Sequence, residues 1–421
     1  MNRSIAPETQ QIDVLKIPAI QSFSLDNGLK VYGVYSAHNV LKVDFIFDAG
    51  KWYEEKNLVA DFTNQLIREG TRNKTSLQIN ETLDFYGANL ESQSYFSNAG
   101  YQLYALSKNI PQLLPLVHEL FTEAAFPAHE VDLYKSNRKE KHLQRLAKTD
   151  YAANRIFLQN MWGKNHPYGR VTEVEDIESI QPEWLSAYYH QYYNAANCFI
   201  ILSGKFDETI IKQLNDLFGN KNWIGQKTTD KQHQREAKKD VVAFQNKENS
   251  VQCSLMVGNA SISKDNPEFD ELTVVNTLFG GYFGSRLMAN IREEKGYTYG
   301  IYSSLTAYKH GGIFEISTDI GKEYRESTLN EIQKEISLIQ TELVDEEELQ
   351  TVKNYMSGKI LRSVDGALRF SDVLKGLLLF DRTPESLSNY LETIQQISAE
   401  RIAELAKKHF DFEKMYKVAV G

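Results

Sequence analysis

The sequence is poor in cysteine and has no long apolar run. Its 421 residues contain only two cysteines, Cys198 and Cys253, each within a short apolar run bounded by turn-forming residues. Isolated cysteines of this kind are typical of buried thiols, so we expect no disulfide framework and a reducing compartment. No segment approaches the roughly 18 consecutive apolar residues of a transmembrane helix, so no membrane span is expected.

The start of the sequence also lacks a secretion signal. Residues 1–18 hold no apolar core of about 7–15 residues, so no signal peptide is expected in the sequence as given. This favours a cytoplasmic location. A periplasmic protein whose leader was removed stays an alternative.

Positive charge is scarce as well. Lys and Arg number 47 against 56 Asp and Glu, which gives a net charge of −9. A negatively charged chain is repelled by nucleic acid and by anionic membranes, so neither is expected as a partner. Apolar residues make up 42% and charged residues 24%, as in ordinary globular proteins. Because the chain is longer than one core usually supports, we expect two domains.

The second half of the sequence repeats the order of elements in the first half. Gly100 opens a strand-like run that matches the run after Gly312, and the apolar run ending at Gly204 matches the one ending at Gly421. Helical patterns match at nearly the same separation, which indicates a duplicated domain. Both copies alternate hairpins with amphipathic helices. This predicts an α+β fold of two duplicated domains, each a largely antiparallel sheet packed with helices.

A polar segment separates the two copies. Residues 221–240 are rich in Lys, Gln and Asp and hold few apolar side chains, which is typical of a linker. We therefore expect an N-terminal domain over residues 1–220, a linker over 221–240 and a C-terminal domain over 241–421.

Residues 280–303 contain the most informative pattern of the second copy. After a glycine pair, Leu287 and Ile291 lie four positions apart, which places both on one face of a helix. Gly296 follows at a position where a helix favours a left-handed stop residue. The spacing predicts a helix that ends just before a strand.

Arg292 and Tyr299 are the two residues of this stretch that offer chemistry. The alternation after Gly296 predicts a strand in which Tyr297, Tyr299 and Ile301 share one face. Arg292, near the helix end, can then converge with Tyr299 and offer charged and phenolic donors to peptide carbonyls or to a developing oxyanion. An Arg in a last helical turn and a Tyr in a strand are also ordinary structural choices.

The run that holds Arg292 and Tyr299, seven positions apart around a Glu-Glu-Lys-Gly turn, resembles the C-terminal domain signature of the insulinase–pitrilysin family of zinc peptidases. The resemblance covers nearly the whole chain, including the duplication, and implies one half of a clamshell-shaped peptidase. In that family the matching Arg and Tyr hold the substrate from the half opposite the metal. The resemblance therefore implies that Arg292 and Tyr299 bind an unfolded or short peptide.

The zinc motif of the family is degenerate in this chain. Active members carry H-x-x-E-H on the first helix of the first domain, where two His bind zinc and the Glu activates water. The closing Gly-Thr of the helix over residues 58–71 sets the register, so these positions fall on Asp61, Asn64 and Gln65. Amide oxygens are poor zinc ligands, and neither amide can act as a general base.

The third ligand of active members, a Glu, comes from a later helix. In the corresponding helix over residues 130–148, Glu140 is the nearest carboxylate. One carboxylate does not hold zinc alone, so we expect no metal or cofactor on this chain. The basic residues from Lys135 to Lys141 are expected to form a solvated helix face. The nine histidines include no pair four positions apart, and we expect them to be exposed or satisfied by neighbours.

Two functions of different classes agree with these patterns. The first is a catalytically silent subunit that binds peptide through Arg292 and Tyr299, with zinc carried by a partner chain of the same family. The alternative is a structural or scaffolding member, like the family's core subunits in respiratory complexes, which has no need of the Arg–Tyr pair. A self-sufficient peptidase with an unusual metal site is disfavoured because ligands are missing. Pairing with an identical or a different chain is left open.

Overall fold

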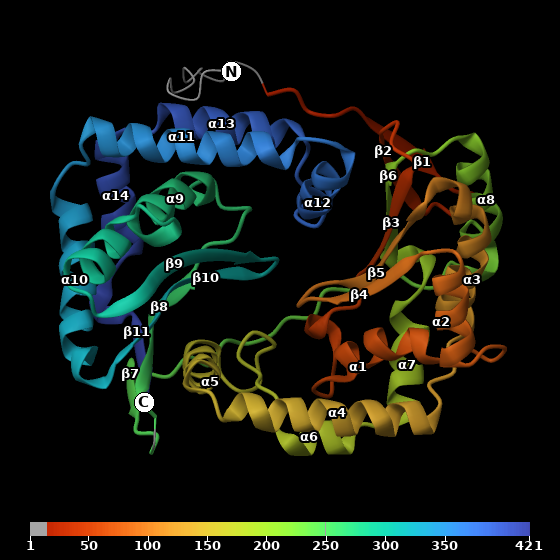
Figure 1. Ribbon diagram of the computed structural model, residues 1–421, viewed down its shortest axis with the longest axis horizontal. Helices are drawn as coiled ribbons and strands as arrows, with labels where there is room; N and C mark the ends of the chain where they lie inside the picture. Colours follow the sequence, from red (N-terminus) through yellow and green to blue (C-terminus); the bar gives the residue numbers. More distant parts are fainter. Residues whose placement is uncertain (1–14, 249) are drawn as a thin grey trace.

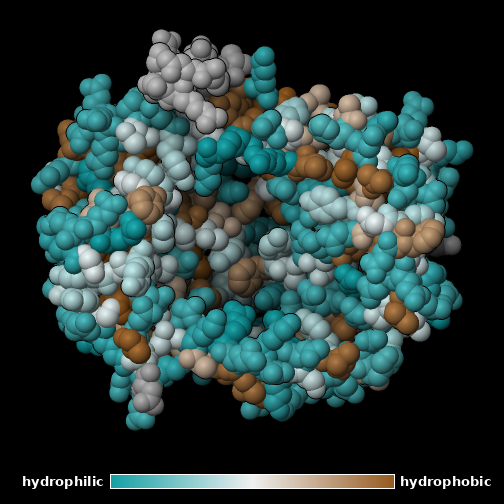
Figure 2. Space-filling model, viewed as in Figure 1, coloured by the Kyte–Doolittle hydropathy of each residue, from teal (hydrophilic) through white to brown (hydrophobic). Residues whose placement is uncertain are grey.

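The computed structural model describes residues 15–248 and 250–421. It contains two β-sheets, each packed with helices, in two halves that lie side by side (Figure 1). The space-filling view shows a central hollow between the two halves (Figure 2). The expectation about a signal peptide depends mainly on residues 1–14, which lie outside the described residues. Within the described ranges, no helix is both long enough and apolar enough to cross a membrane.

The first sheet has six strands in the order β1-β2-β6-β3-β5-β4. Strands β2 and β6 run parallel, and the other neighbours run antiparallel. The strands span Ile20–Ser24 (β1), Lys30–Tyr35 (β2), Val40–Phe47 (β3), Asn89–Ser94 (β4), Ala99–Leu106 (β5) and Cys198–Gly204 (β6).

The second sheet has five strands in the order β7-β11-β8-β10-β9. They span Val242–Gln245 (β7), Gln252–Ser261 (β8), Thr298–Tyr308 (β9), Gly311–Gly321 (β10) and Tyr416–Val420 (β11). Here β7 and β11 are parallel, as β2 and β6 are in the first sheet, and the other neighbours are antiparallel. Apart from the added hairpin strand β1, order and direction repeat those of the first sheet. The predicted α+β fold with a duplicated, largely antiparallel sheet is confirmed.

Some of the helices begin at a residue whose side chain accepts hydrogen bonds from their first N–H groups. Asp207, Asp345 and Ser398 accept such hydrogen bonds at the starts of α8, α11 and α14. Helices of the first half span Val59–Leu66 (α1), Ser76–Phe85 (α2), Ile110–Glu123 (α3), Ala128–Leu146 (α4), Thr149–Trp162 (α5), Val174–Ser179 (α6), Pro182–Tyr192 (α7) and Glu208–Phe218 (α8). Those of the second half span Phe269–Asn276 (α9), Arg325–Thr341 (α10), Glu346–Ser363 (α11), Ala367–Leu378 (α12), Glu385–Gln396 (α13) and Ala399–His409 (α14).

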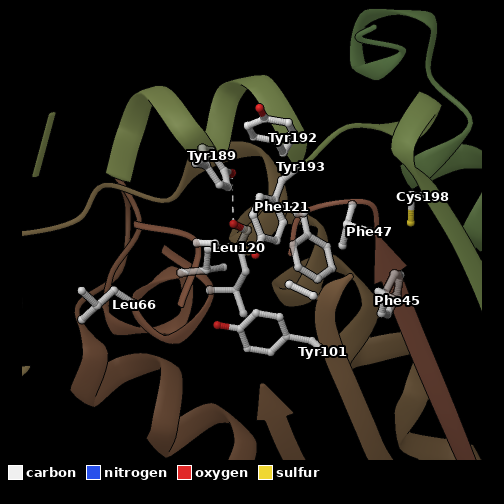
Figure 3. Packing of buried hydrophobic residues seen from close by; sticks show 14 of the residues in the cluster. Phe45, Phe47, Leu66, Tyr101, Leu120, Phe121, Tyr189, Tyr192, Tyr193 and Cys198 are labelled. Atoms are coloured by element: carbon white, nitrogen blue, oxygen red, sulfur yellow. Dashed lines mark hydrogen bonds between the residues drawn. The ribbon is translucent and has the colours of Figure 1, made fainter. Parts of the chain in front are cut away.

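Aromatic side chains fill the core between the first sheet and its helices. Phe45 and Phe47 of β3 pack on Phe121 of α3, with ring centroids 5.2 and 5.0 Å apart (Figure 3). Cys198 lies at the edge of this cluster, and burial raises the pKa of its thiol. Cys253 is buried in the second half, and both cysteines are free, as expected.

Each half also places one helix on the sheet of the other half. Helix α5 of the first half packs against β8 and β11, whereas α12 of the second half packs against β2 and β6. Accordingly, Met256 and Val418 of the second sheet belong to the core of the first half, and Ile46 and Ile201 of the first sheet belong to the core of the second half. We call this arrangement the helix exchange. It places a helix of the other half against two strands of each sheet.

A buried charge cluster marks the contact of α12 with the first sheet. Lys42 of β3 is fully buried, and its Nζ lies 2.7 Å from Asp372 Oδ1 of α12 and 3.3 Å from Asp44 Oδ2. Gln102 donates to Asp44 Oδ1 at 2.6 Å. Burial by itself lowers the pKa of Lys42, but the two carboxylates reverse this effect and hold the pKa above its ordinary value. Lys42 therefore stays charged within the interface.

The segment expected to be a linker is an ordered connection. Residues 221–240 form a short 3₁₀ turn at Lys221–Trp223 followed by irregular backbone. The Trp52 indole N–H donates to the Lys231 carbonyl at 3.1 Å, and His233 Nε2 lies 3.0 Å from the Trp52 carbonyl oxygen. These contacts hold the segment against the first half.

A buried carboxylate lies at the start of α1, the helix that carries the degenerate metal positions. Glu54 accepts hydrogen bonds from the N–H groups of Leu58 at 3.3 Å and Ala60 at 3.0 Å, near the helix start. Arg170 Nη1 lies 3.7 Å from Glu54 Oε1. Burial is the largest influence on Glu54 and raises its pKa to about 7.

Replacing Lys42 with Met should destabilise the protein by about 3–5 kcal/mol, because Asp44 is then buried without its ion-pair partner. The double variant Lys42→Met/Asp44→Leu should recover most of this loss, since it removes both buried charges. Urea denaturation at pH 7 measures both changes. A single variant within about 0.5 kcal/mol of the wild type would contradict the assigned role of the ion pair.

Glu54 should make stability fall as pH rises from about 4.5 to about 7. In this window the folded state keeps a proton on Glu54 that the unfolded state has released, so raising the pH favours unfolding. Relative to Glu54→Gln, the wild type should lose on the order of 3 kcal/mol across the window. Urea denaturation at several pH values tests this. Glu55→Gln is the matched control, since the Glu55 side chain is 89% exposed, and a pH-independent gap between wild type and Glu54→Gln would refute the assignment.

Candidate functional site

The first degenerate position, Asp61, is paired with a cation. Asp61 Oδ2 lies 3.2 Å from Arg138 Nη2 of α4. Glu140, the carboxylate of α4 expected nearest to the degenerate metal positions, does not lie at them. It is exposed and accepts a hydrogen bond from Gln144 at 3.4 Å. Residues two positions apart point to different faces of a helix, so α4 presents Arg138 rather than Glu140 to α1.

The second position, Asn64, is fully buried and fully engaged. Its amide N–H donates to the Gln93 carbonyl at 2.9 Å, and its side-chain oxygen accepts from the Tyr193 hydroxyl at 2.9 Å. The Tyr101 hydroxyl donates to the Asn64 backbone carbonyl. Both tyrosines lie in the aromatic core beneath α1 (Figure 3). Asn64 therefore acts as a structural hydrogen-bonding residue.

These residues do not fit the zinc ion that the resemblance implies for active members. Asp61 already faces a guanidinium, the Asn64 oxygen is occupied by a hydroxyl, and Gln65 offers a half-buried amide. Neutral amides and an arginine do not form a zinc site. Across residues 15–248 and 250–421, no group of three or more His, Cys, Asp or Glu side chains is placed to hold a metal ion.

The helix that contains Arg292 exists, but its turns are wider than expected. The backbone over Met288–Glu294 is π-helical, and the Lys295 N–H donates to the carbonyl of Asn290, five positions back, at 2.9 Å. Leu287 and Ile291 are fully buried, as their spacing predicts. π-Helical turns are rare and often occur at functional sites.

Arg292 lies on the outer side of this segment, and its side chain is 33% exposed. Its Nε–H donates to the Tyr299 backbone carbonyl at 3.1 Å, and its Cζ lies 4.7 Å from the ring centroid of Phe283. Its Nη1 lies 3.5 Å from Glu293 Oε1. The structure thus brings Arg292 to Tyr299, as expected, but through the Tyr299 backbone.

The prediction that Tyr299 and Ile301 share one face is wrong. Tyr299 is 93% exposed, whereas Ile301 is fully buried. Thr298 pairs with Ile320 and Ile301 pairs with Thr318, so three steps along β9 oppose two along β10. This β-bulge adds one residue to β9 and shifts the alternation of its side chains.

The bulge leaves the Tyr299 side chain in solvent, on a segment with other exposed rings. The Thr298 hydroxyl accepts from the Gly300 N–H at 3.0 Å and so holds the irregular backbone. Phe283, which lies against Arg292, is 59% exposed, and Tyr302 of β9 is also exposed. Sequence reasoning did not single out Phe283, and its place in the glycine-flanked aromatic run before the helix was the available signal.

Two sequence profiles cover most of the chain. The profile described as Insulinase (Peptidase family M16) matches residues 35–168, and the one described as Peptidase M16 inactive domain matches residues 179–356. The first contains the degenerate metal positions, and the second contains Arg292 and Tyr299.

Individual relatives agree with these profiles. An uncharacterized zinc protease of Bacillus subtilis (strain 168) is 22% identical over 359 residues, which cover 85% of this chain and 86% of that protein. Cytochrome b-c1 complex subunit 1, mitochondrial, of Mus musculus is 24% identical over 208 residues, 48% of this chain and 42% of that protein. The crystal structure of a peptidase M16 inactive domain from Pseudomonas fluorescens matches with a TM-score of 0.86 and 24% identity, covering 96% of this chain and 98% of that one. The chain therefore belongs to the insulinase family, peptidase family M16, as a member without the family's zinc-binding motif.

Proposed function

We propose that this chain is a catalytically silent subunit of a heteromeric zinc peptidase. It binds peptide substrate through Arg292 and Tyr299, and a zinc-bearing partner chain of the same family carries the metal. The observation that carries the proposal is the solvent-exposed Tyr299 beside Arg292, on a chain whose own metal positions hold the Asp61–Arg138 pair. Exposed Tyr and Phe rings next to an Arg have the composition of binding hot spots.

The geometry suits recognition of a peptide backbone. The Tyr299 carbonyl and the Phe283 ring orient the Arg292 guanidinium before any substrate arrives. Its remaining N–H groups can donate to a peptide carbonyl, and the Tyr299 hydroxyl can donate to the same backbone or to a tetrahedral oxyanion. An unfolded or short peptide presents such carbonyls, whereas a folded one uses them internally.

The proposal includes the partner, the cellular location and the domain division that were expected from the sequence. The partner is a family member carrying H-x-x-E-H, and the location is cytoplasmic. Nucleic acid and membranes are not partners, because the net charge is −9. We retain the division into domains at 1–220 and 241–421 with the linker at 221–240.

The alternative is a structural subunit that does not take part in proteolysis. The likeness to a protein named as a subunit of the cytochrome b-c1 complex favours it. A scaffold makes no use of the Arg292 guanidinium or the Tyr299 hydroxyl, so these two residues separate the alternatives.

The purified chain should hold far less than one zinc ion after dialysis against zinc and should not cleave an unstructured peptide, because Asp61, Asn64 and Gln65 are not a ligand set. Metal analysis and a peptidase assay measure this. The variant Asp61→His/Gln65→His, with two His on one face of α1, is the positive control and should bind zinc more tightly. About one tightly held zinc per wild-type chain, with chelator-sensitive cleavage, would refute the expectation.

In a complex with a zinc-bearing partner, Arg292→Ala or Tyr299→Phe should lower peptide cleavage while folding and zinc content stay unchanged. Loss of one donor aimed at developing charge costs on the order of 10²–10³ in rate when the geometry is good. Tyr299→Phe keeps the ring, so it isolates the hydroxyl.

Two exposed residues far from the site serve as controls for this experiment, Arg72→Ala and Tyr35→Phe. Neither should change the cleavage rate. If all four variants cleave at the wild-type rate, the structural alternative is preferred.

A further inference from the structure

A basic cavity adjoins the degenerate metal site. It has a volume of about 200 Å³ and lies among the start of α1, helices α4 and α5, and the loop over residues 167–172 (Figure 1). Six cationic side chains line it: Lys51, Arg138, Lys141, Arg145, Arg155 and Arg170. Among its described lining residues Glu54 is the one carboxylate. Such a concentration of positive charge is notable in a chain with a net charge of −9.

Half of these cations are neutralised within the chain. Arg138 pairs with Asp61, Arg155 Nη2 lies 2.8 Å from Glu173 Oε1, and Arg170 lies near Glu54. The Glu54 oxygens are also used by the backbone N–H groups at the start of α1. The cavity therefore keeps an excess of positive charge.

The other three cations have no carboxylate partner in the described part of the chain. No Asp or Glu oxygen there lies within 4.0 Å of Lys51, Lys141 or Arg145. Arg145 packs instead on the ring of Tyr151, with its Cζ 4.3 Å from the centroid. This contact orients the guanidinium without removing its charge.

Two further donors in the wall are buried without a hydrogen-bond acceptor. Neither Arg170 Nη1 nor His142 Nε2 has a hydrogen-bond acceptor among the described residues, although His142 is only 4% exposed and Arg170 Nη1 lies 3.7 Å from Glu54 Oε1. His142 Nδ1 lies 3.3 Å from the Tyr151 hydroxyl. When that hydroxyl donates to Nδ1 of a neutral imidazole, the ring proton lies on Nε2, which is then a donor. The expectation that every histidine is exposed or satisfied is wrong for His142.

The expected solvated basic face on α4 is present only in part: Lys141 is exposed, whereas Lys135 and Lys139 have partners. Lys135 donates to the Ile180 carbonyl at 3.1 Å, and Lys139 pairs with Glu178 beside α6. Arg138 and Lys141 turn to the cavity. Helix α4 thus has two basic sides, one bound to a neighbouring helix and one lining an open space.

We infer that this cavity binds a carboxylate of a peptide, either an acidic side chain or the C-terminal carboxyl group. Charge-assisted hydrogen bonds from several fixed donors are the usual means of holding a carboxylate. The volume is below the roughly 300–1,000 Å³ of sites for drug-sized ligands, so it admits one side chain or chain end. A large polyanion is repelled by the overall negative charge. The inference rests on the proposed function in one respect, that a peptide is the occupant.

Direct binding of labelled peptides to the purified chain tests the inference without a partner chain. Four probes are compared by fluorescence anisotropy: an unstructured peptide containing Glu, the same peptide with Gln in place of Glu, each with a free or an amidated C-terminus. The wild type should bind a peptide bearing a carboxylate about tenfold or more tightly than the neutral, amidated one.

Two double variants test whether the preference for a carboxylate comes from the cavity. Lys141→Gln/Arg145→Gln should abolish it, while Lys108→Gln/Lys212→Gln, which removes two exposed cations elsewhere, should keep it. Arg292→Ala should weaken charged and neutral peptides alike, so failure of the proposed function is distinguishable from failure of this inference.

Three results would overturn the inference. The first is equal binding of charged and neutral peptides by the wild type. The second is an equal loss of preference in both double variants, which indicates a general charge effect. The third is binding of inorganic phosphate at the cavity without any preference for a peptide carboxylate, which indicates an anion site for another ligand.

Discussion

The helix exchange is the constraint on which the rest of the structure depends. Helices α5 and α12 each cover the sheet to which they do not belong, so apolar residues of both sheets are buried in the opposite core. Separating the halves would expose these surfaces, and the free-energy cost grows with the apolar area exposed. The helix exchange therefore favours the arrangement in which the two halves stay packed together.

The two halves share the same order and direction of strands but differ in the side chains at the corresponding sites. In the first half, α1 holds Asp61 against Arg138 and Asn64 within a net of buried hydroxyls. In the second half, a π-helical turn and a β-bulge direct Arg292 and Tyr299 outward. Matching strand order shows that the fold tolerated both changes. What differs is local: a pair of charges in one copy and one additional strand residue in the other.

Much of this organisation was predictable from local patterns, whereas its details depend on contacts between distant residues. The spacing of Leu287 and Ile291 specifies a buried helix face whether the turn is α-helical or π-helical. The orientation of Tyr299 was not predictable, because it depends on how β9 pairs with β10. The partner of Asp61 depends on the rotation of α4, and the basic cavity requires α4, α5 and a loop to meet.

The charge cluster on the inner face of the first sheet has a consequence for synthesis on the ribosome. The first half is synthesised before α12. The face that carries Lys42, Asp44 and Gln102 is therefore exposed to water until the ribosome has made the chain as far as Leu378, the end of α12. Charged and amide groups are well solvated during that interval, and they interrupt a face that also carries the apolar Ile46 and Ile201. The arriving helix then supplies Asp372. The charge cluster is costly to bury in the folded protein, but its polar groups keep this part of the sheet hydrated before α12 has been synthesised.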